Sequence, residues 1–337
     1  MNPLRVHAYA ALAPRTTLVP FAYEASPLGD GQVELEITHC GLCHSDVHLI
    51  DDAWKRSVYP LVPGHEIIGR VTALGRDVTS FAVGERAGVG WQRGACFKCE
   101  ACVAGHENLC AQQEATCVGH HGGVADRVRT DASFAFAIPE AIGSAEAAPL
   151  LCGGVTVFSP LLRWGAGVGR TVGVIGVGGL GHLAVRFAAA LGCEVVAFSS
   201  SPDKDVAIRA MGAHEVVRST DPRELRLQAG RLDLLVATAP AQLDWIAYVQ
   251  ALRPGGVLCL VGAAPDLLRV PAALLLTGQK VICGSDIGDR ATMRAMLAFA
   301  ARHGVAPTIE TRPMHEVNLG VEQVRANKAR YRIVLQA

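Results

Sequence analysis

Four cysteines lie close together in the segment ACFKCEACVAGHENLC, residues 95–110. Two, two and seven residues separate Cys96, Cys99, Cys102 and Cys110 in turn. Four thiolates so close in sequence can converge on one tetrahedral zinc ion, and a site filled by protein ligands leaves no position for a substrate. The spacing therefore predicts a structural zinc site. An iron–sulfur cluster is the alternative, although the spacing does not match the usual ferredoxin runs.

A second set of possible metal ligands is dispersed along the chain. Cys43 lies in CGLCHSDVH, His65 and Glu66 lie in PGHE, and Cys152 lies in PLLCGGVT. Two cysteines and a histidine on one zinc ion would leave a fourth position for water or a substrate oxygen. Taken singly, each residue also has an ordinary explanation, because buried cysteine is common and a lone histidine is usually a hydrogen-bonded core residue. Spacing alone leaves both interpretations open.

The segment TVGVIGVGGLGHLAVRFAAALG, residues 171–192, is predicted to form a strand, a glycine turn and a helix. Gly176 permits the tight turn, Gly178 lets the backbone approach a pyrophosphate, and Gly181 lets the helix lie close to the sheet. The helix offers N–H groups and the positive end of its dipole to the phosphates. Because a second apolar strand follows, a dinucleotide-binding unit is favoured over a structural turn. The expected cofactor contacts here are Gly176, Gly178, Gly179, Leu180 and Gly181.

The end of that second strand reads SSSPDK, from Ser199 to Lys204, and carries no acid at the strand tip. A carboxylate there usually binds the ribose 2′-hydroxyl and would repel a 2′-phosphate, whereas hydroxyls and a lysine suit the phosphate. We therefore expect NADP(H) as cofactor, with its 2′-phosphate at Ser199, Ser200 and Lys204. A helix-capping serine with a solvated lysine is the alternative, since Asp203 lies close by.

Composition limits the classes of function. The chain has 337 residues, half of them apolar, so it can bury a large core and should divide into two domains. Lys plus Arg equals Asp plus Glu at 31 each, so charge gives no sign of a nucleic acid or an anionic membrane as partner. Without a signal-peptide core or an apolar run of membrane-spanning length, we expect a cytoplasmic protein. There, its 11 cysteines favour metal ligation over disulfides.

The chain changes character along its length. Short strands separated by Gly and Pro predict a β domain over residues 1–154; one of them, VELEIT at 33–38, alternates as a half-buried strand should. Residues 155–285 alternate between strand and helix, which predicts a doubly wound parallel sheet and an α/β fold. Residues 286–337 are too few to fold alone, so we expect this segment to return to the first domain.

Five segments occur in the order found in zinc-dependent medium-chain alcohol dehydrogenases. They are GLCHSDVH, VPGHEIIG, the four-cysteine segment, PLLCGGVTVFSPL and GVIGVGGLGHLAV. The match runs from about residue 30 to the closing KARYRIVL and covers nearly the whole chain. The chain resembles most the cinnamyl-alcohol-dehydrogenase-like, NADP-dependent branch, whose members also carry a serine-rich turn after the second strand. The resemblance implies a chaperonin-10-like β-barrel catalytic domain joined to a Rossmann domain.

The same resemblance implies two zinc ions per subunit, one structural and one catalytic. Cys43, His65 and Cys152 would hold the catalytic zinc, and Glu66 would join them when no substrate is bound. Members of the family form dimers or tetramers, so a homo-oligomer is expected. The zinc and the nicotinamide would face each other between the two domains.

Further residues take their expected roles from the resemblance. Ser45 would hydrogen-bond the substrate oxygen, His48 would relay its proton outward through the cofactor ribose, and Asp46 would orient His65. Without the resemblance, these three residues are an exposed serine and histidine at a helix start and its acidic first-turn residue. Residues expected near the cofactor are Thr156, Val261, Ser285 and Arg332.

Some features depart from the family pattern or have two explanations. The segment between Cys110 and Gly122 is shorter than in many cinnamyl-type members, and Val124 stands where many relatives have tyrosine. These loops border the substrate entrance, so an aryl-alcohol substrate does not follow from the resemblance.

Trp54 and Trp91 could supply flat apolar pocket walls or take part in ordinary packing.

Together these features predict an NADP(H)-dependent, zinc-requiring alcohol dehydrogenase or aldehyde reductase acting on small to medium primary alcohols and the corresponding aldehydes, with aryl compounds left open. An NAD-dependent aliphatic alcohol dehydrogenase is the alternative among enzymes. A non-catalytic NADPH-binding protein is a different class, and loss of a zinc ligand would favour it; all of the ligands are present. A zinc-free quinone reductase shares the architecture but would not need them.

Overall fold

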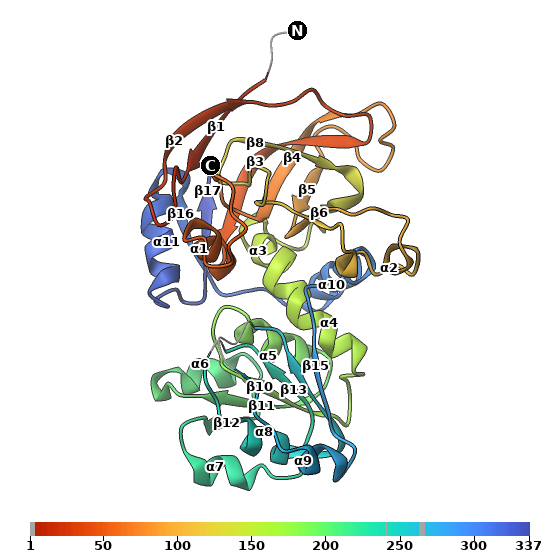
Figure 1. Cartoon of the computed structure of the whole chain (residues 1–337), viewed down its shortest axis with the longest axis vertical. Coiled ribbons are helices and arrows are strands. Elements are labelled where there is room, and N and C mark those ends of the chain that lie inside the picture. The colour runs from red at the N-terminus through yellow and green to blue at the C-terminus, as the bar shows by residue number, and fades with distance from the viewer. Residues whose placement is uncertain (1–3, 240, 263–266) are drawn as a thin grey trace. The chain divides into compact units, whose positions relative to one another are not determined.

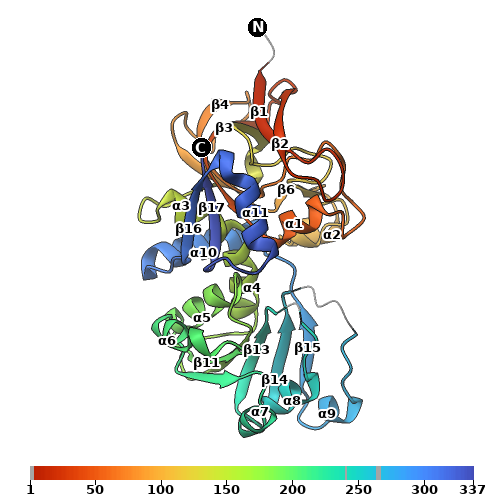
Figure 2. The same ribbon diagram turned by 90° about the vertical axis from the view of Figure 1, so that its left-hand side faces the viewer.

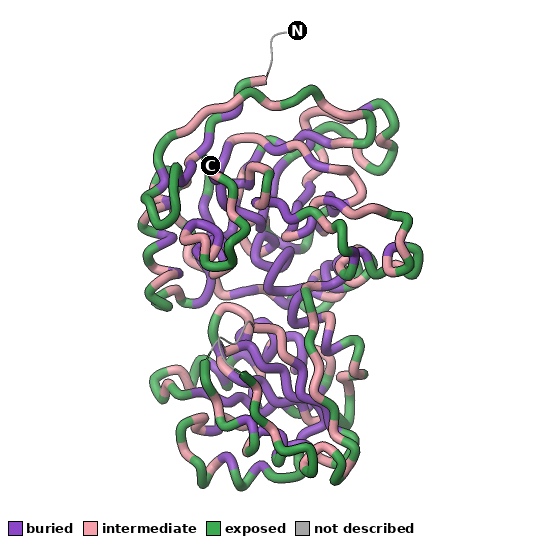
Figure 3. The backbone as a smooth tube through the Cα atoms, viewed as in Figure 1, coloured by how far each residue is buried: buried purple, intermediate pink, exposed green. Residues whose placement is uncertain are grey.

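The computed structural model describes residues 4–239, 241–262 and 267–337, and its strands form two large sheets (Figure 1). The sheets belong to separate units of the chain. One unit comprises Met1–Cys152 with Asp289–Ala337, and the other comprises Gly153–Gly288. Each unit has its own buried interior (Figure 3).

The first unit is built on a sheet of seven strands in the order β16-β17-β3-β4-β5-β9, with β8 also paired to β3. The C-terminal strand β17 runs antiparallel to β3, with Ile333 opposite Leu42, so the end of the chain completes this sheet (Figure 2). Its strands are β3 (Gln32–Leu42), β4 (Glu66–Leu74), β5 (Arg86–Val89), β8 (Arg127–Asp131), β9 (Ala135–Ala137), β16 (Ile309–Pro313) and β17 (Arg332–Gln336).

Two smaller sheets and five α-helices complete the described part of the first unit. The small sheets pair β1 (Arg5–Ala10) with β2 (Val19–Glu24) and β6 (Gln92–Gly94) with β7 (Glu114–Ala115). The helices are α1 (His44–Ile50), α2 (Glu100–Val103), α3 (Ser144–Pro149), α10 (Arg290–His303) and α11 (Val317–Arg325). Apolar side chains from the sheets, α1 and α11 form one buried cluster.

The described part of the second unit contains six parallel strands in the order β12-β11-β10-β13-β14-β15. This is the doubly wound order, in which the chain reverses direction across the sheet between β10 and β13. The strands are β10 (Thr171–Ile175), β11 (Glu194–Ser199), β12 (Glu215–Arg218), β13 (Leu232–Ala237), β14 (Leu252–Leu260) and β15 (Val281–Gly284). The helices are α4 (Val155–Arg163), α5 (Gly181–Ala190), α6 (Asp205–Ala210), α7 (Pro222–Leu227), α8 (Trp245–Ala251) and α9 (Ala272–Leu276).

One helical stretch, Ser144–Arg163, is long and apolar enough to cross a membrane by length and composition alone. Two prolines and two glycines interrupt its apolar residues, so no continuous apolar run of membrane-spanning length was expected there. Within the fold, 78% of the most apolar 18 residues of this stretch is buried, as in a helix of a protein core.

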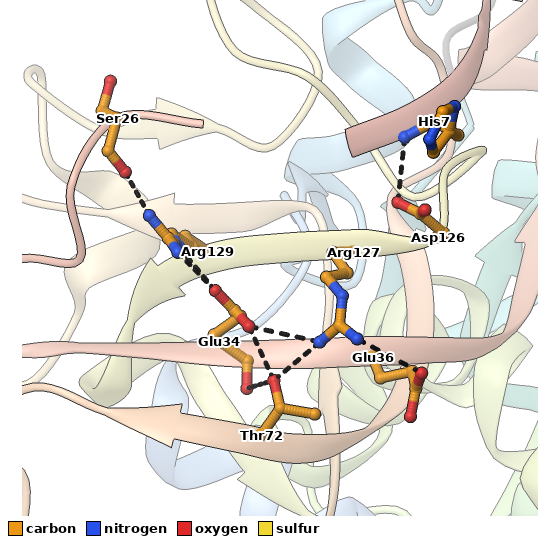
Figure 4. A network of polar contacts seen from close by, with 8 residues as sticks. All are labelled: His7, Ser26, Glu34, Glu36, Thr72, Asp126, Arg127 and Arg129. Atoms are coloured by element: carbon orange, nitrogen blue, oxygen red, sulfur yellow. Dashed lines mark hydrogen bonds and ion pairs between the residues drawn. The ribbon is translucent and has the colours of Figure 1, made fainter. Parts of the chain in front are cut away.

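Glu34 corrects a detail of the sequence analysis. The alternation of VELEIT places Glu34 on the solvent face of a half-buried strand, yet its exposed fraction is only 6%. Two arginines of the neighbouring strand β8 cover it (Figure 4). Arg129 donates from Nε to Oε2 of Glu34 at 2.8 Å, and Arg127 donates from Nη1 to Oε1 at 3.2 Å. The hydroxyl of Thr72 donates to the same Oε1 at 2.8 Å, so the buried charge is fully hydrogen-bonded.

Replacing Arg129 by methionine is expected to lower the free energy of unfolding by about 2 kcal/mol. Loss of a partner from a buried ion pair costs roughly 3–5 kcal/mol, but Arg127 and Thr72 still contact Glu34. Burial alone would raise the pKa of Glu34, but Arg129 and Thr72 hold it below its ordinary value of 4.5. The contribution of its charge to stability is therefore present above pH 4.5 and is lost as the pH falls through the lower pKa of the folded state.

Urea unfolding of wild type and R129M at pH 7 and at pH 3 would measure both effects. Arg76 supplies a matched control, because its side chain is 76% exposed and its partner Asp30 is 57% exposed. Arg76→Met should cost less than about 1 kcal/mol. Equal destabilisation by the two substitutions would contradict the assignment of Glu34 as a buried, paired charge.

Candidate metal centre and active site

Three separate segments bring four possible metal ligands together in the first unit. The ligand atoms of Cys43, His65, Glu66 and Cys152 all lie within 4.8 Å of one another, and all four residues are buried. Nε2 of His65 lies 3.3 Å from Sγ of Cys152. This arrangement makes the dispersed set one group, as the resemblance implies.

The register of two strands explains why these residues meet. Strand β3 runs antiparallel to β4 with Gly41 opposite Glu66, so the end of β3 lies beside the start of β4. Cys43 follows β3 directly as the N-cap of α1, and His65 directly precedes β4. Cys152 comes from a π-helical turn, Leu150–Gly154, between α3 and α4.

Asp46 connects two of these segments. One of its oxygens, Oδ1, accepts hydrogen bonds from the backbone N–H of Gly64 and from Nδ1 of His65, both at 2.9 Å. The other oxygen accepts the backbone N–H of Cys43 at 2.8 Å. Asp46 is 1% exposed, so these bonds are shielded from water. A carboxylate bound to Nδ1 fixes the ring so that Nε2 faces the thiols, as in many zinc sites.

Buried charge shifts the pKa values of this group. Burial alone would lower the pKa of His65, but the negative charge of Asp46 raises it well above its ordinary value. A hydrogen bond from the Cys152 thiol, together with the positive charge of Arg332, holds the pKa of Cys43 well below its ordinary value. Cys43 is therefore favoured as a thiolate, and the neighbouring imidazole of His65 holds its proton. A cation bound to this group would displace protons from its ligands, as metal binding does.

Glu66 supplies the observation that tests whether a cation fits here. It is fully buried, and its Oε1 forms an ion pair with Arg332, which is 4% exposed. Its other oxygen, Oε2, accepts no hydrogen bond from any described residue. Burial raises the pKa of Glu66 to about 6. An unpartnered buried carboxylate oxygen beside two sulfurs and an imidazole nitrogen is the environment that a divalent cation would satisfy. The donor set therefore fits zinc.

The space for Glu66 comes from a glycine opposite it. A Cβ at Gly41 would overlap Oε2 of Glu66, so any side chain at Gly41 would displace the carboxylate. The ion pair places Arg332 beside the metal-ligand group, which the sequence analysis did not anticipate. Its expected contact with the cofactor stays a prediction.

A second overlapping group contains Asp46, His65 and Cys117, whose ligand atoms also lie within 4.8 Å of one another. The sequence analysis missed Cys117, because nothing in its local sequence marks it as a neighbour of His65. Both oxygens of Asp46 already accept hydrogen bonds, and burial raises the pKa of Cys117 to about 11. Cys117 is thus a neutral thiol next to the ligand histidine, and this group is the weaker candidate for a metal.

The expected proton-relay residues lie on α1. The hydroxyl oxygen of Ser45 is 3.8 Å from Sγ of Cys43, and His48 is half-buried three residues further along the helix. Residues three apart share a helix face, so Ser45 and His48 lie on the same side of α1. Their roles stay predictions.

Aromatic rings join this helix to the metal-ligand group. The ring of Trp91 meets that of His65 edge-on, with centroids 5.0 Å apart. Trp91 lies 6.0 Å from Trp54, and Trp54 lies 5.0 Å from His48. Both tryptophans therefore border the site, which supports their interpretation as flat apolar walls.

The four-cysteine segment also converges. The sulfurs of Cys96, Cys99, Cys102 and Cys110 lie within 4.8 Å of one another, with Cys110 at 3.5 Å and Cys102 at 3.9 Å from Cys96. Backbone N–H groups of Lys98 and Cys99 lower the pKa of Cys96 to about 6, which favours the thiolate. Four sulfurs in this arrangement match a closed tetrahedral site.

An ion pair anchors the four-cysteine segment, residues 95–110 and called the lobe below, within the first unit. Arg290 of α10 donates from Nε to Oε1 of Glu107 at 2.8 Å, and Glu107 is 3% exposed. The guanidinium also lies over the ring of Phe97, 4.9 Å from its centroid. The lobe is therefore fixed by side chains as well as by its cysteines.

The glycine turn of the second unit has the predicted form. Gly176 has φ +83°, a conformation that residues with side chains avoid. A Cβ at Gly181 would overlap the carbonyl oxygen of Gly176, whereas no described atom lies within 4 Å of a Cβ at Gly178. Thr238, which the sequence analysis missed, donates its hydroxyl to the Gly176 carbonyl at 2.7 Å and so holds the turn against β13.

These glycines give a matched pair of substitutions. Gly181→Ala should lower the free energy of unfolding by about 2 kcal/mol, because overpacking against a backbone atom forces the helix to shift. Gly178→Ala should leave stability within about 0.5 kcal/mol of wild type but weaken dinucleotide binding, because the added methyl occupies the open side of the turn. Thermal unfolding and fluorescence titration with NADPH would measure the two effects. Equal stability of the two variants would contradict the close helix–turn contact.

The structure also places the remaining expected cofactor residues, all in the second unit. Ser199 is only 4% exposed, and its hydroxyl oxygen accepts the backbone N–H of Ser201 at 3.2 Å, so it helps to shape the turn. Ser200 is exposed, and Lys204 is partly exposed at the end of a 3₁₀ turn. Three more lie elsewhere in this unit: Thr156 in α4, and Val261 and Ser285 directly after β14 and β15. Their contacts with the cofactor stay predictions.

Comparison with known proteins agrees with this geometry. Residues 29–140 match the family model of the alcohol dehydrogenase GroES-like domain, and residues 179–302 match that of the zinc-binding dehydrogenases. The aldehyde reductase AdhA of Synechocystis sp. is 42% identical over 330 residues, which cover 98% of both chains. A probable cinnamyl alcohol dehydrogenase of Oryza sativa is 39% identical and matches 94% of this chain and 89% of its own.

Solved structures show the same fold. A cinnamyl alcohol dehydrogenase of Sorghum bicolor superimposes with a TM-score of 0.94 at 37% identity, covering 99% of this chain and 98% of its own. A cinnamyl alcohol dehydrogenase of Helicobacter pylori, solved in complex with NADP(H), has a TM-score of 0.92 at 29% identity, with the same coverage. The expected fold of a GroES-like domain and a Rossmann domain is thereby confirmed. The chain belongs to the zinc-dependent medium-chain alcohol dehydrogenases, in their cinnamyl-alcohol-dehydrogenase-like branch, and is an oxidoreductase of alcohols and aldehydes.

Proposed function

We propose that this chain is an NADP(H)-dependent reductase of small aldehydes that also oxidises the corresponding primary alcohols. The group of Cys43, His65, Glu66 and Cys152 is the observation that carries the proposal, because it combines a complete zinc donor set with an unpartnered carboxylate oxygen. Residues 1–154 with 286–337 would form the catalytic domain and residues 155–285 the dinucleotide-binding domain. We propose a cytoplasmic homo-oligomer, a dimer or a tetramer, with a small-molecule substrate and neither nucleic acid nor membrane as partner.

Cys43, His65 and Cys152 would hold the catalytic zinc, while Cys96, Cys99, Cys102 and Cys110 would hold the structural one. Bound at the catalytic position, zinc supplies a Lewis acid that polarises a carbonyl oxygen or eases ionisation of an alcohol. Asp46 keeps the ring of His65 turned toward the sulfurs.

The chain's own residues would then orient the substrate and move its proton. The Ser45 hydroxyl, whose oxygen lies 3.8 Å from Sγ of Cys43, would hydrogen-bond the substrate oxygen and carry its proton. His48, on the same face of α1, would exchange that proton with the outside through the cofactor ribose. Trp54 and Trp91 would keep water away from the apolar part of the substrate.

The cofactor proposal has two supports. The loop Ser199–Lys204 offers three serine hydroxyls and a lysine. The residues at the strand tip itself, Ser199 to Ser201, carry no carboxylate. The relative of Helicobacter pylori was solved with NADP(H) bound. Bound in the second unit, this cofactor supplies the hydride for aldehyde reduction and accepts it in alcohol oxidation.

Initial rates of zinc-replete protein with NADPH and with NADH, across aliphatic and aryl aldehydes, would test the proposal. We expect kcat/KM to be at least about 100-fold higher with NADPH, as the loss of a charge-assisted phosphate contact costs roughly 1.5–3 kcal/mol and several contacts are involved. A preference for NADH would favour the NAD-dependent alcohol dehydrogenase. Absence of turnover with every aldehyde and both cofactors would favour a non-catalytic NADPH-binding protein.

A further inference from the structure

Arg218 lies at the tip of the strand next to the serine-rich turn. Strands β11 and β12 are parallel, and Arg218 stands directly opposite Ser199 in their register. Its Nη1 donates to the backbone carbonyl of Ser199 at 3.4 Å, and its Nη2 forms an ion pair with Asp205 at the start of α6. Its backbone N–H donates to Oε2 of Glu224 at 2.6 Å, which fixes the end of β12.

We propose that Arg218 is a further specificity residue for the cofactor, and that its guanidinium donates hydrogen bonds to the 2′-phosphate of NADP(H). The proposal rests on the proposed function, since it assigns an additional contact in the same cofactor site. Neither the glycine turn nor the loop Ser199–Lys204 indicates this residue in the sequence, because it belongs to the following strand.

The position follows from the architecture of parallel sheets. In a doubly wound fold the ribose lies beyond the carboxyl end of the second strand, and the ends of neighbouring parallel strands share one edge. Arg218 is the last residue of β12, in register with the last residue of β11. Its side chain is 19% exposed, so it is partly open to solvent.

The chemistry of the turn favours a second cation in addition to Lys204. The hydroxyl of Ser199 already donates to the backbone carbonyl of Ser201 at 3.5 Å and accepts its backbone N–H at 3.2 Å, which reduces its capacity to donate to a phosphate. An arginine has five N–H donors in a planar fork and matches phosphate geometry, and the two side-chain contacts described above leave other donors available.

Asp205 determines how Arg218 can act. The side chain of Asp205 is 37% exposed, and an ion pair at such a position contributes little to stability. A doubly charged phosphate can therefore compete for the guanidinium. Without Arg218, the carboxylate of Asp205 would instead remain beside the phosphate and repel it.

Binding of 2′,5′-ADP and 5′-ADP to the zinc-loaded protein, measured by calorimetry, tests the proposal without turnover. Arg218→Gln should weaken binding of 2′,5′-ADP by roughly 10- to 100-fold and change binding of 5′-ADP by less than about threefold. Arg218→Lys should lie between wild type and the glutamine variant, because it keeps the charge but loses the fork. Arg226→Gln, at an exposed residue of α7, removes the same charge elsewhere and should bind both nucleotides as wild type does.

The outcomes separate the two proposals. If wild type binds 2′,5′-ADP no more tightly than 5′-ADP, the proposed use of NADP(H) fails. If wild type prefers 2′,5′-ADP and Arg218→Gln keeps the full preference, only the role of Arg218 is overturned. The double variant Arg218→Gln with Asp205→Asn should recover only part of the loss, because it removes the repulsion by Asp205 but still lacks the guanidinium. Full recovery in that double variant would overturn direct phosphate contact, because Arg218 would then act only by neutralising Asp205.

Discussion

Replacing Cys152 by alanine is expected to lower kcat/KM for aldehyde reduction by at least about 10³-fold. Removal of even one group that stabilises charge in an active site lowers kcat by roughly 10²–10³-fold. Its sulfur lies 3.3 Å from Nε2 of His65 and is one of only three ligands proposed for the catalytic zinc. The glycine turn lies in the second unit, so NADPH binding should be largely unchanged. Steady-state kinetics and fluorescence titration with NADPH would measure both quantities.

Cys193 gives a matched control for this substitution. It is also a buried thiol, 2% exposed, but it directly precedes β11 in the second unit and belongs to none of the metal-ligand groups found among the described residues. Cys193→Ala should retain most of the activity and both equivalents of zinc. Undiminished activity of Cys152→Ala would remove Cys152 from the site and, with it, the proposed ligand set.

Replacing Asp46 by asparagine is expected to lower both zinc affinity and kcat/KM by roughly 10- to 100-fold. The carboxylate accepts hydrogen bonds from three donors, namely the backbone N–H groups of Cys43 and Gly64 and Nδ1 of His65. An asparagine has only one acceptor oxygen, so its NH₂ group must face a donor and turn either His65 or Cys43 away.

Competition with a chelator would measure zinc affinity in this variant. Asp51 caps the other end of α1 and pairs with Arg325, so Asp51→Asn removes one charge from the same helix without touching the ligands. We expect Asp51→Asn to keep wild-type affinity and activity. Similar losses in both variants would mean that Asp46 acts only by stabilising α1.

The parts of this site that are local in sequence could be predicted from the sequence. The glycine unit could be recognised because strand, turn and helix are contiguous, and φ of +83° at Gly176 is what its residue type permits. The four-cysteine lobe was similarly clear, because all its sulfurs come from one short segment. The fold class followed from the change between β-rich and alternating segments.

The other contacts depend on strand register and could not be derived from local pattern. Cys43 and His65 meet because Gly41 pairs with Glu66 across β3 and β4, and only the resemblance to a family indicated this. Glu34 was misread because alternation reports which face a residue occupies, and cannot show that arginines of β8 cover that face.

Three functional neighbours were missed for the same reason. Thr238 reaches the glycine turn from a strand 62 residues later, and Arg218 reaches Ser199 from 19 residues later. Cys117 lies beside His65 although its own segment contains no ligand motif. In each case the signal is a tertiary contact between segments that are distant in sequence, which periodicity and spacing do not encode.

Anomalous diffraction at the zinc absorption edge, from crystals of the zinc-loaded protein, would test the central claim most directly. The account predicts two peaks per chain, one among the four sulfurs of the lobe and one about 2.3 Å from the sulfurs of Cys43 and Cys152 and about 2.0 Å from Nε2 of His65. A lobe peak alone, or a second peak bound instead through Cys117 and Asp46, would contradict it.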